Sequence, residues 1–184
     1  MMNRKIRRST ESDHSAMAEI LQAAFGPEQG PEIEALVNHL LMDSTAQPSL
    51  SLVATVGDRL VGHILFTQVR LISGSQTISA MILAPLSVHP HYQNQGIGGQ
   101  LIQDGLQRLK AEGIGLVFVL GYPAYYTKYG FTTASVQDFA PPYPLAPEQW
   151  DAWMLKELHP GILGHFQGSV QCADALNQPQ YWHE

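Results

Sequence analysis

The sequence predicts a mixed α/β fold built on a mainly antiparallel sheet. Three strand-like runs follow one another between tight turns in residues 49–90, which is typical of antiparallel strands. An amphipathic helix and a fully apolar run come next, and this order indicates one βαβ crossover. The chain has 184 residues, of which 45% are hydrophobic, and this is enough apolar surface for one core. We therefore expect a single domain over residues 1–184.

The first quarter of the chain predicts one strand and two helices. Residues 5–10 read as a short strand. Apolar residues at helical spacing predict a helix over residues 12–26, and Gly26 followed by Pro27 marks its end. A second apolar stripe predicts another helix over residues 31–42.

The next segment predicts a hairpin and a third strand. Gly57 and Asp58 separate strand-like residues 49–56 from residues 59–71, as in a β-hairpin. A turn at Ser73 and Gly74 leads into a long apolar strand over residues 76–90. Pro85 lies inside this strand and has no N–H for the ladder, so we expect a local bulge there.

The remaining elements alternate between helix and strand. A helix is predicted over residues 97–111, ended by glycine, and the apolar run 114–121 is typical of a strand buried on both faces. Four further elements are expected: a short helix, a strand, a second short helix and a last strand, over residues 123–130, 131–139, 147–158 and 169–173.

Composition and charge exclude several classes of protein. The net charge of −6 argues against a nucleic-acid partner. No apolar run reaches the roughly 18 residues of a membrane span, and no apolar stretch follows the basic start as in a signal peptide. A single cysteine, Cys172, provides neither a disulfide nor a thiolate cluster for a metal. We expect a cytoplasmic protein without a metal site, and we interpret the basic cluster Arg4, Lys5, Arg7 and Arg8 as a solvated edge.

The stretch 93–102, Gln-Asn-Gln-Gly-Ile-Gly-Gly-Gln-Leu-Ile, places three glycines at the start of a helix. Free N–H groups and the helix dipole make such a start an anion site, which glycine opens to a phosphate. No lysine follows as in a Walker loop, and the glycine spacing differs from that of a dinucleotide fold. The alternative is that the glycines serve close packing of the helix, and the local string favours neither interpretation.

The flanking residues decide between these interpretations. Gln93, Gly96 and Gly98 fit the order Gln-x-x-Gly-x-Gly, and a segment ending in Val-x-Pro precedes them. Further on, residues 125–131 read Tyr-Tyr-Thr-Lys-Tyr-Gly-Phe. These two motifs together resemble the GNAT family of acyl-CoA-dependent N-acyltransferases, over about residues 4–136. The run Leu-Gly-Tyr-Pro-Ala-Tyr-Tyr before and within the second motif is similar to a bacterial subgroup of predicted N-acetyltransferases.

The resemblance implies the GNAT acyl-CoA N-acyltransferase fold, in which two central strands splay apart and hold acetyl-CoA. The pantetheine arm would pair with the strand edge at Leu86, Ser87 and Val88, and an N–H near Val88 would hold the thioester oxygen. The pyrophosphate would rest on the loop that the family places at Gln93, Asn94, Gln95, Gly96, Ile97, Gly98 and Gly99. Because the loop itself contains no cation, these contacts would depend on main-chain N–H groups.

The resemblance also implies an N-acetyltransferase whose general acid is Tyr126, with Tyr125 packed inward. For the general base four candidates stay open: Glu28 and Glu32 between the first two helices, and His63 and His89 near the sheet. The acceptor would be a primary amine, either of a small molecule or of a protein, and many relatives are homodimers. The alternative function is a non-catalytic acyl-CoA-binding module on the same fold. The proline-rich residues 140–150 either cover the sheet or close the acceptor site, and we favour the first role. The C-terminal extension, about residues 140–184, contains no family motif.

Overall fold

A computed structural model describes residues 3–72, 76–134, 136 and 138–183. Its strands form one sheet in the order β1–β2–β3–β4–β5–β8–β6, with β9 beside β3 and β7. Only the β4–β5 and β7–β9 pairs are parallel among the described strands, so the predicted mainly antiparallel sheet is confirmed. The strands are β1 (Arg4–Arg8), β2 (Leu50–Val56), β3 (Arg59–Ile72), β4 (Ser79–Val88), β5 (Leu116–Leu120), β6 (Thr132–Thr133), β7 (Phe139–Ala140), β8 (Trp153–Glu157) and β9 (Gly168–Gln171).

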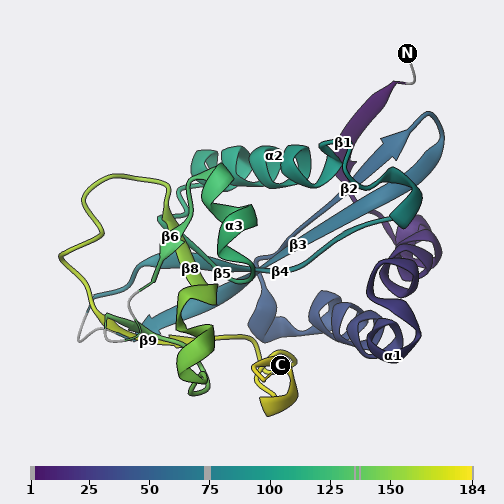
Figure 1. The fold of residues 1–184 in the computed structure, drawn as a ribbon. Helices are drawn as coiled ribbons and strands as arrows, with labels where there is room; N and C mark the ends of the chain where they lie inside the picture. The colour runs from purple at the N-terminus through teal and green to yellow at the C-terminus, as the bar shows by residue number, and fades with distance from the viewer. Residues whose placement is uncertain (1–2, 73–75, 135, 137, 184) are drawn as a thin grey trace.

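Helices cover both faces of this sheet. Figure 1 shows α2 (Ile97–Ala111) over one face and α1 (His14–Met42) over the other. Successive residues of a strand point to opposite faces. In β3, Leu65 accordingly packs with the core under α1, while its neighbour Phe66 packs with the core under α2. None of the described helices has the length and apolar character that a membrane crossing requires.

The helix α1 has a break where the sequence predicts one. Gly26 has φ 80° and ψ 177°, which is not a helical conformation and which side chains other than glycine rarely adopt. The two halves of α1 on either side of Gly26 therefore correspond to the two predicted helices.

The predicted hairpin and bulge are both present. Gly57, with φ 60°, turns β2 into β3. In the β3–β4 ladder, Ile64 pairs with Leu86 and Phe66 with Leu83, so Leu65 alone lies opposite Ala84 and Pro85. This two-against-one count is a β-bulge at the predicted proline. The turn predicted at Ser73 and Gly74 lies outside the described residues.

The strands β4 and β5 pair over a short stretch and then separate. Their ladder ends at the pair Ile82 and Phe118. Beyond this point β4 continues to Val88, paired with β3 alone, and β5 continues to Leu120, paired with β8. The main chain of β4 after Ile82 therefore presents one edge without a strand partner, as the resemblance predicted.

The C-terminal third differs from its prediction. In place of a helix over residues 147–158, a 3-10 helix η5 (Pro147–Ala152) leads into β8. This strand lies between β5 and β6, so Trp153, Met154 and Leu155 are all buried and leave no alternation to read. The strand predicted over residues 131–139 is present only at its ends, as β6 and β7, while Ser135 and Gln137 lie outside the described residues. The last predicted strand is confirmed as β9.

Candidate active site

A cavity of about 730 Å³ lies where β4 and β5 separate. Its walls come from α1, the ends of β4 and β5, α3 (Pro123–Tyr126), η5 and the C-terminal residues 176–183. This volume lies within the usual range of small-molecule sites, roughly 300–1,000 Å³. The cavity is therefore large enough for the reacting ends of two substrates.

The three predicted β4 residues lie beside this cavity in different ways. Leu86 lines it, whereas Ser87 and Val88 are buried. Val88 packs in the core under α2, and the side chain of Ser87 points to the opposite face, toward α1. The side chains of Ser87 and Val88 are directed to the two faces of the sheet. The edge of β4 that faces the separated β5 therefore consists of main chain.

The glycine loop presents a row of free donors. The main-chain N–H groups from Asn94 to Gly99 have no hydrogen-bond acceptor among the described residues. Asn94 (φ 59°) and Gly96 (φ 81°) both have left-handed conformations, and the first helical carbonyl of α2 belongs to Gly96. Free N–H groups at the positive end of a 15-residue helix fit a diphosphate.

Two of the three glycines are also required by packing. A Cβ added at Gly98 would lie 2.5 Å from the hydroxyl of Tyr125, and one at Gly99 would overlap the ring of Tyr129. A Cβ at Gly96 would meet nothing within 4 Å, so only its positive φ requires glycine. Both interpretations of the glycine stretch therefore apply, at different positions: Gly96 shapes the loop, while Gly98 and Gly99 admit the tyrosines.

The amide side chains of the loop make contacts within the protein. Gln93 Nε2 donates to the carbonyl of Val88 at 3.0 Å, which ties the loop back to β4. Gln95 Nε2 donates to the carbonyl of His91 at 3.3 Å. The side chain of Ile97 is buried in the core, 2% exposed, so this residue offers the cleft only its main chain.

A cation does reach the loop, although the loop sequence contains none. Arg4 Nη1 donates to the carbonyl of Gln95 at 2.8 Å. Arg4, Val56 and Arg59 lie directly opposite one another across β1, β2 and β3, and therefore point to the same face as α2. The basic N-terminal cluster lies on the exposed edge strand β1, as expected, and strand pairing in addition brings Arg4 to Gln95, 91 positions further along the chain.

The two adjacent tyrosines of α3 both line the cavity. Tyr126 is 8% exposed and its ring packs against Phe131 with centroids 5.6 Å apart, whereas Tyr125 is half-buried with its hydroxyl close to Gly98. Tyr125 packs against the core, as expected, but Tyr126 is the more deeply buried of the two. Burial raises the pKa of Tyr126 above its ordinary value and that of Tyr125 to about 12, so both phenols stay protonated near neutral pH.

The four candidate bases lie in different places. Glu32 lines the cavity and Glu28 does not. His89 caps the turn before the glycine loop, where its Nδ1 accepts the N–H of His91. His63 is fully buried in β3, and its Nε2 lies 2.9 Å from Ser51 Oγ. Burial, followed by the nearby charge of His14, lowers the pKa of His63 to about 4, so the ring is neutral.

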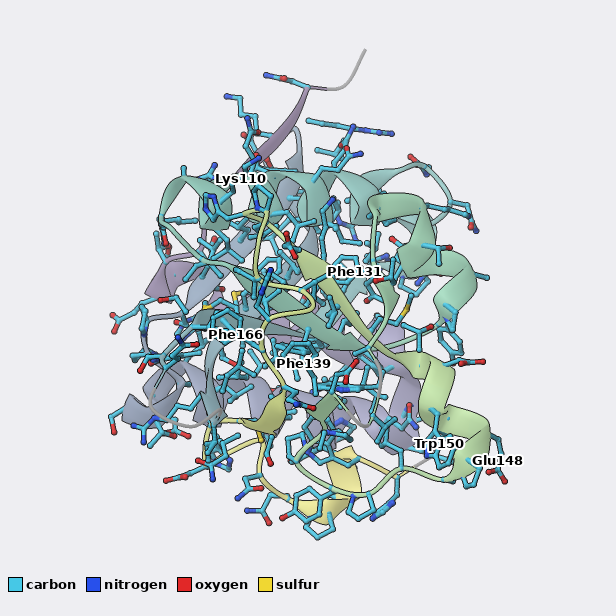
Figure 2. The ribbon with its side chains drawn as sticks, turned by 90° about the vertical axis from the view of Figure 1, so that its left-hand side faces the viewer. Lys110, Phe131, Phe139, Glu148, Trp150 and Phe166 are labelled. Carbon is cyan, nitrogen blue, oxygen red and sulfur yellow. The ribbon has the colours of Figure 1, made fainter. Side chains whose placement is uncertain are left out.

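The outer wall of the cavity comes from residues that no sequence motif indicated. Glu148 and Asp151 of η5 line it, so this short helix forms part of the cavity wall and does more than cover the sheet. Figure 2 shows Glu148 and Trp150 close together on this short helix at the edge of the molecule. The only sequence signal was the proline-rich composition of the segment.

The chain end completes this wall. Tyr181, Trp182 and His183 line the cavity, and Trp182 is 2% exposed. Main-chain N–H groups hold the segment to the end of α1, where Ala175 N donates to Asp43 Oδ2 at 2.9 Å. The tail is thus fixed against α1 by hydrogen bonds and by a buried indole.

Known proteins share these features. The model of the acetyltransferase (GNAT) domain matches residues 5–134. The Escherichia coli (strain K12) protein named as the uncharacterized N-acetyltransferase YjhQ is 39% identical over 167 residues, which is 89% of each chain. The family model's match over residues 5–134 includes the glycine loop and the tyrosine pair.

Solved structures show the same arrangement. The crystal structure of the GNAT family N-acetyltransferase YhbS from Escherichia coli in complex with CoA has a TM-score of 0.83 and 27% identity, covering 97% of this chain and 94% of its own. A GNAT family acetyltransferase from Brucella melitensis, in complex with acetyl-CoA, has a TM-score of 0.74 and 26% identity, covering 96% and 99%. Together with the separated strands, the glycine loop and the buried tyrosine, these matches show that the chain belongs to the GNAT family of N-acetyltransferases.

Proposed function

We propose that this protein transfers the acetyl group of acetyl-CoA to a primary amine. One observation carries the proposal: the unpaired edge of β4 and Tyr126 border the gap between β4 and β5, and the free N–H groups of residues 94–99 adjoin it at Gly98, where an added Cβ would lie 2.5 Å from the Tyr125 hydroxyl and 3.7 Å from Leu86 Cδ2. Acetyl-CoA supplies a thioester, which is already activated toward an amine. We call the β4–α2 side of the gap the cofactor end, and the side lined by α1, η5 and the C-terminal residues the acceptor end.

The cofactor end binds through main chain. The N–H groups of residues 94–99 bind the diphosphate, with Arg4 adding positive charge next to Gln95. The edge of β4 at Leu86, Ser87 and Val88 pairs with the amides of the pantetheine arm, as an added strand would. The YhbS and Brucella melitensis proteins hold CoA and acetyl-CoA, which supports the same ligand here.

Tyr126 donates the proton that the departing thiol group needs. A phenol that burial keeps protonated is suited to this task, because the thiolate of an ordinary thiol, with pKa about 8.5, is stabilised by a nearby donor. A main-chain N–H near Val88 stabilises the thioester oxygen as negative charge develops on it.

The acceptor end is suited to a cationic amine. Glu32, Glu148 and Asp151 line it, and none of the described lining residues is Lys or Arg. Carboxylates lining one end of a cavity attract an ammonium group and keep it near the thioester. A small diamine and a lysine-like side chain both carry a primary amine that these carboxylates would attract. The test therefore includes both kinds of acceptor.

The test is acetyl-CoA-dependent thiol release with propylamine, 1,4-diaminobutane, glycinamide and Nα-acetyl-lysine amide. We expect turnover with at least one amine, and we expect Tyr126→Phe to lower kcat about 100-fold or more because the acid is lost. Tyr125→Phe is the matched control: it removes the neighbouring hydroxyl in the same cavity and is expected to lower kcat less than 5-fold.

Two outcomes would contradict the proposal. Tight acetyl-CoA binding without turnover of any amine would indicate an acyl-CoA-binding module. Turnover that survives Tyr126→Phe but falls with Tyr125→Phe would show that Tyr125, and not Tyr126, is the general acid. Calorimetry with acetyl-CoA alone separates the first outcome from a protein that binds nothing.

A further inference from the structure

The acceptor end of the cavity has an apolar inner wall. Its side chains come from α1, from β4 and from the chain end, which Figure 1 shows on the same side of the sheet as α1. All of them either belong to the core under α1 or pack against it. We call this set the apolar wall: Phe25, Ile33, Leu36, Ile82, Leu176 and Trp182.

The apolar wall presents carbon to the cavity. Trp182 has one polar side-chain atom, the indole Nε1, and this atom already donates to the carbonyl of Leu176 at 3.0 Å. The side chains of the other members are hydrocarbon throughout. Phe25 and Ile33 line the cavity and are only half-buried, although both are apolar. Apolar surface of this kind is stabilised when hydrocarbon replaces the water that would otherwise contact it.

The charged side chains of the acceptor end lie further out than the apolar wall. Glu32, Glu148 and Asp151 line the same cavity, and all three residues are exposed. Leu36, one turn after Glu32 on the same face of α1, is buried, and so is Ile82 on β4. An ammonium group that enters from solvent therefore meets carboxylates first and hydrocarbon second.

Either of the two substrates could supply the hydrocarbon that covers this wall. The acyl chain would extend from the thioester, which lies between β4 and β5 under the proposed function. Of the apolar wall, only Ile82 belongs to either of these strands, and the other members lie on α1 and at the chain end. The position of the wall therefore favours the amine as its ligand.

We propose that the acceptor is an alkylamine, a primary amine whose nitrogen is followed by several methylene groups without polar substituents. This inference rests on the proposed function and narrows its class of acceptor. Free alkylamines and lysine side chains share this chemistry. The α-amines of amino acids and peptides do not, because a carbonyl oxygen lies within three bonds of the nitrogen. Against the apolar wall such an oxygen would lose its water without gaining a hydrogen-bond donor, which costs free energy.

The first test varies the amine at saturating acetyl-CoA. From methylamine through propylamine to hexylamine, we expect kcat/KM to rise about 3-fold for each added methylene group. For 2-aminoethanol, which has a hydroxyl where propylamine has a methyl group, we expect a value about 5-fold or more below that of propylamine. Each value is extrapolated to the neutral amine from a pH profile, so that differences in basicity do not enter. Equal values along the series would overturn the proposal.

Two further acceptors separate the sources of an alkylamine. A kcat/KM for Nα-acetyl-lysine amide close to that of hexylamine would indicate lysine side chains, and a value far below it would indicate free alkylamines. In either case we expect the better of the two to exceed glycinamide about 10-fold or more. A value for glycinamide as high as that of hexylamine would overturn the proposal.

The second test shortens one side chain of the apolar wall. We expect Ile33→Ala to lower kcat/KM about 5-fold for hexylamine and less than about 2-fold for methylamine, which has no chain to contact the wall. Leu41→Ala is the matched control, because Leu41 is also half-buried on α1 and packs against the same core but does not line the cavity. An equal loss for both amines, or the same pattern in Leu41→Ala, would overturn the proposal.

The third test asks whether the wall holds the acyl chain instead. With methylamine as acceptor, we expect hexanoyl-CoA to react more slowly than acetyl-CoA, and we expect Ile33→Ala to leave this ratio unchanged. If Ile33→Ala lowered turnover of hexanoyl-CoA and left hexylamine unaffected, the apolar wall would be an acyl site and the proposal would be wrong.

A last measurement does not depend on turnover. The reaction products N-hexylacetamide and N-methylacetamide are titrated by calorimetry into the protein with CoA present. We expect the hexyl amide to bind about 30-fold or more tightly than the methyl amide, and Ile33→Ala to remove about 5-fold of this difference. Equal binding of the two amides would overturn the inference. If the wild-type protein acetylates no amine at all, the proposed function fails, and the amide titration still decides whether the apolar wall binds hydrocarbon.

Discussion

The cofactor end of the cleft is made mostly of main chain, whereas the acceptor end is made of side chains. At the cofactor end, the free N–H groups of residues 94–99 and the edge of β4 come from one continuous segment. At the acceptor end, Glu32, Glu148 and Tyr181 come from three segments that lie far apart in the chain. Every residue except proline offers the same main-chain N–H group, whatever its side chain. At the cofactor end a substitution should therefore matter only when it changes the backbone conformation or the packing.

We expect the two ends to differ in what they determine: the cofactor end sets the affinity for acetyl-CoA, and the acceptor end sets the choice of amine. Under the proposed function, the N–H groups of residues 94–99 would bind the diphosphate of any acyl-CoA, because this diphosphate is the same in all of them. Under the proposed function, the carboxylates and aromatic residues of the acceptor end would contact the amine, and the amine is what distinguishes one N-acetyltransferase from another. Substitutions at the two ends should therefore change different constants, and three of them test this, in order of decreasing effect.

The largest effect is expected from Gly99→Val. The new side chain would overlap the ring of Tyr129, with Cε1 and Cζ 2.9 Å from its Cβ, and would push α2 away from that ring. We expect the Kd of acetyl-CoA to rise at least 30-fold and the free energy of unfolding to fall by about 1–3 kcal/mol. Calorimetry and urea unfolding measure the two effects. Gly113→Asn, at a positive φ just after the other end of α2 with open space around it, serves as control. Equal losses in both variants would show that the effect is not specific to the start of α2.

A smaller effect is expected at the acceptor end from Glu32→Gln. Removing one carboxylate of the cavity lowers the attraction of a second ammonium group by about 1 kcal/mol, which corresponds to a roughly 5-fold higher KM for 1,4-diaminobutane. The KM for propylamine and the Kd of acetyl-CoA should change less than 2-fold. Glu28→Gln changes the same kind of residue on the same helix outside the cavity and should have no effect. An acetyl-CoA Kd that changed with Glu32→Gln would contradict the separation of the two ends.

The smallest effect is expected from Arg4→Gln, which removes a positive charge at the cofactor end. Arg4 is exposed, so losing its charge next to Gln95 should raise the Kd of acetyl-CoA only about 3-fold at low salt, and the difference should disappear near 0.5 M salt. Arg8→Gln is the control on the same strand, because Arg8 is already paired with Glu112 at 2.8 Å. A Kd that changed equally in both variants would indicate a general charge effect rather than a contact at the loop.

The amino-acid sequence predicted the turns, the bounds of α2 and the bulge well because their signals are local. Gly26, Gly57, Gly96 and Gly113 all have positive φ values at the predicted breaks, and α2 begins and ends where it was expected. The bulge at Pro85 follows from the chemistry of one residue. Each of these features depends on a few neighbouring residues, so it can be predicted from the sequence alone.

The features that were missed depend on distant partners. Arg4 lies at the glycine loop only because β1 pairs with β2 and β2 with β3. Which of Tyr125 and Tyr126 faces inward depends on Phe131 and on the glycines of α2. The apolar run of β8 reads equally well as helix, because a strand buried on both faces has no alternating pattern.

The position of β8 also affects how the chain is made. This strand enters the sheet between β5 and β6, although both are synthesised before it. A nascent chain that ends near residue 136 therefore already contains the glycine loop and the tyrosine pair, while the apolar edge of β5 still lacks its partner strand β8. Until residues 153–157 leave the ribosome, that edge is a place where chaperones bind or other nascent chains aggregate.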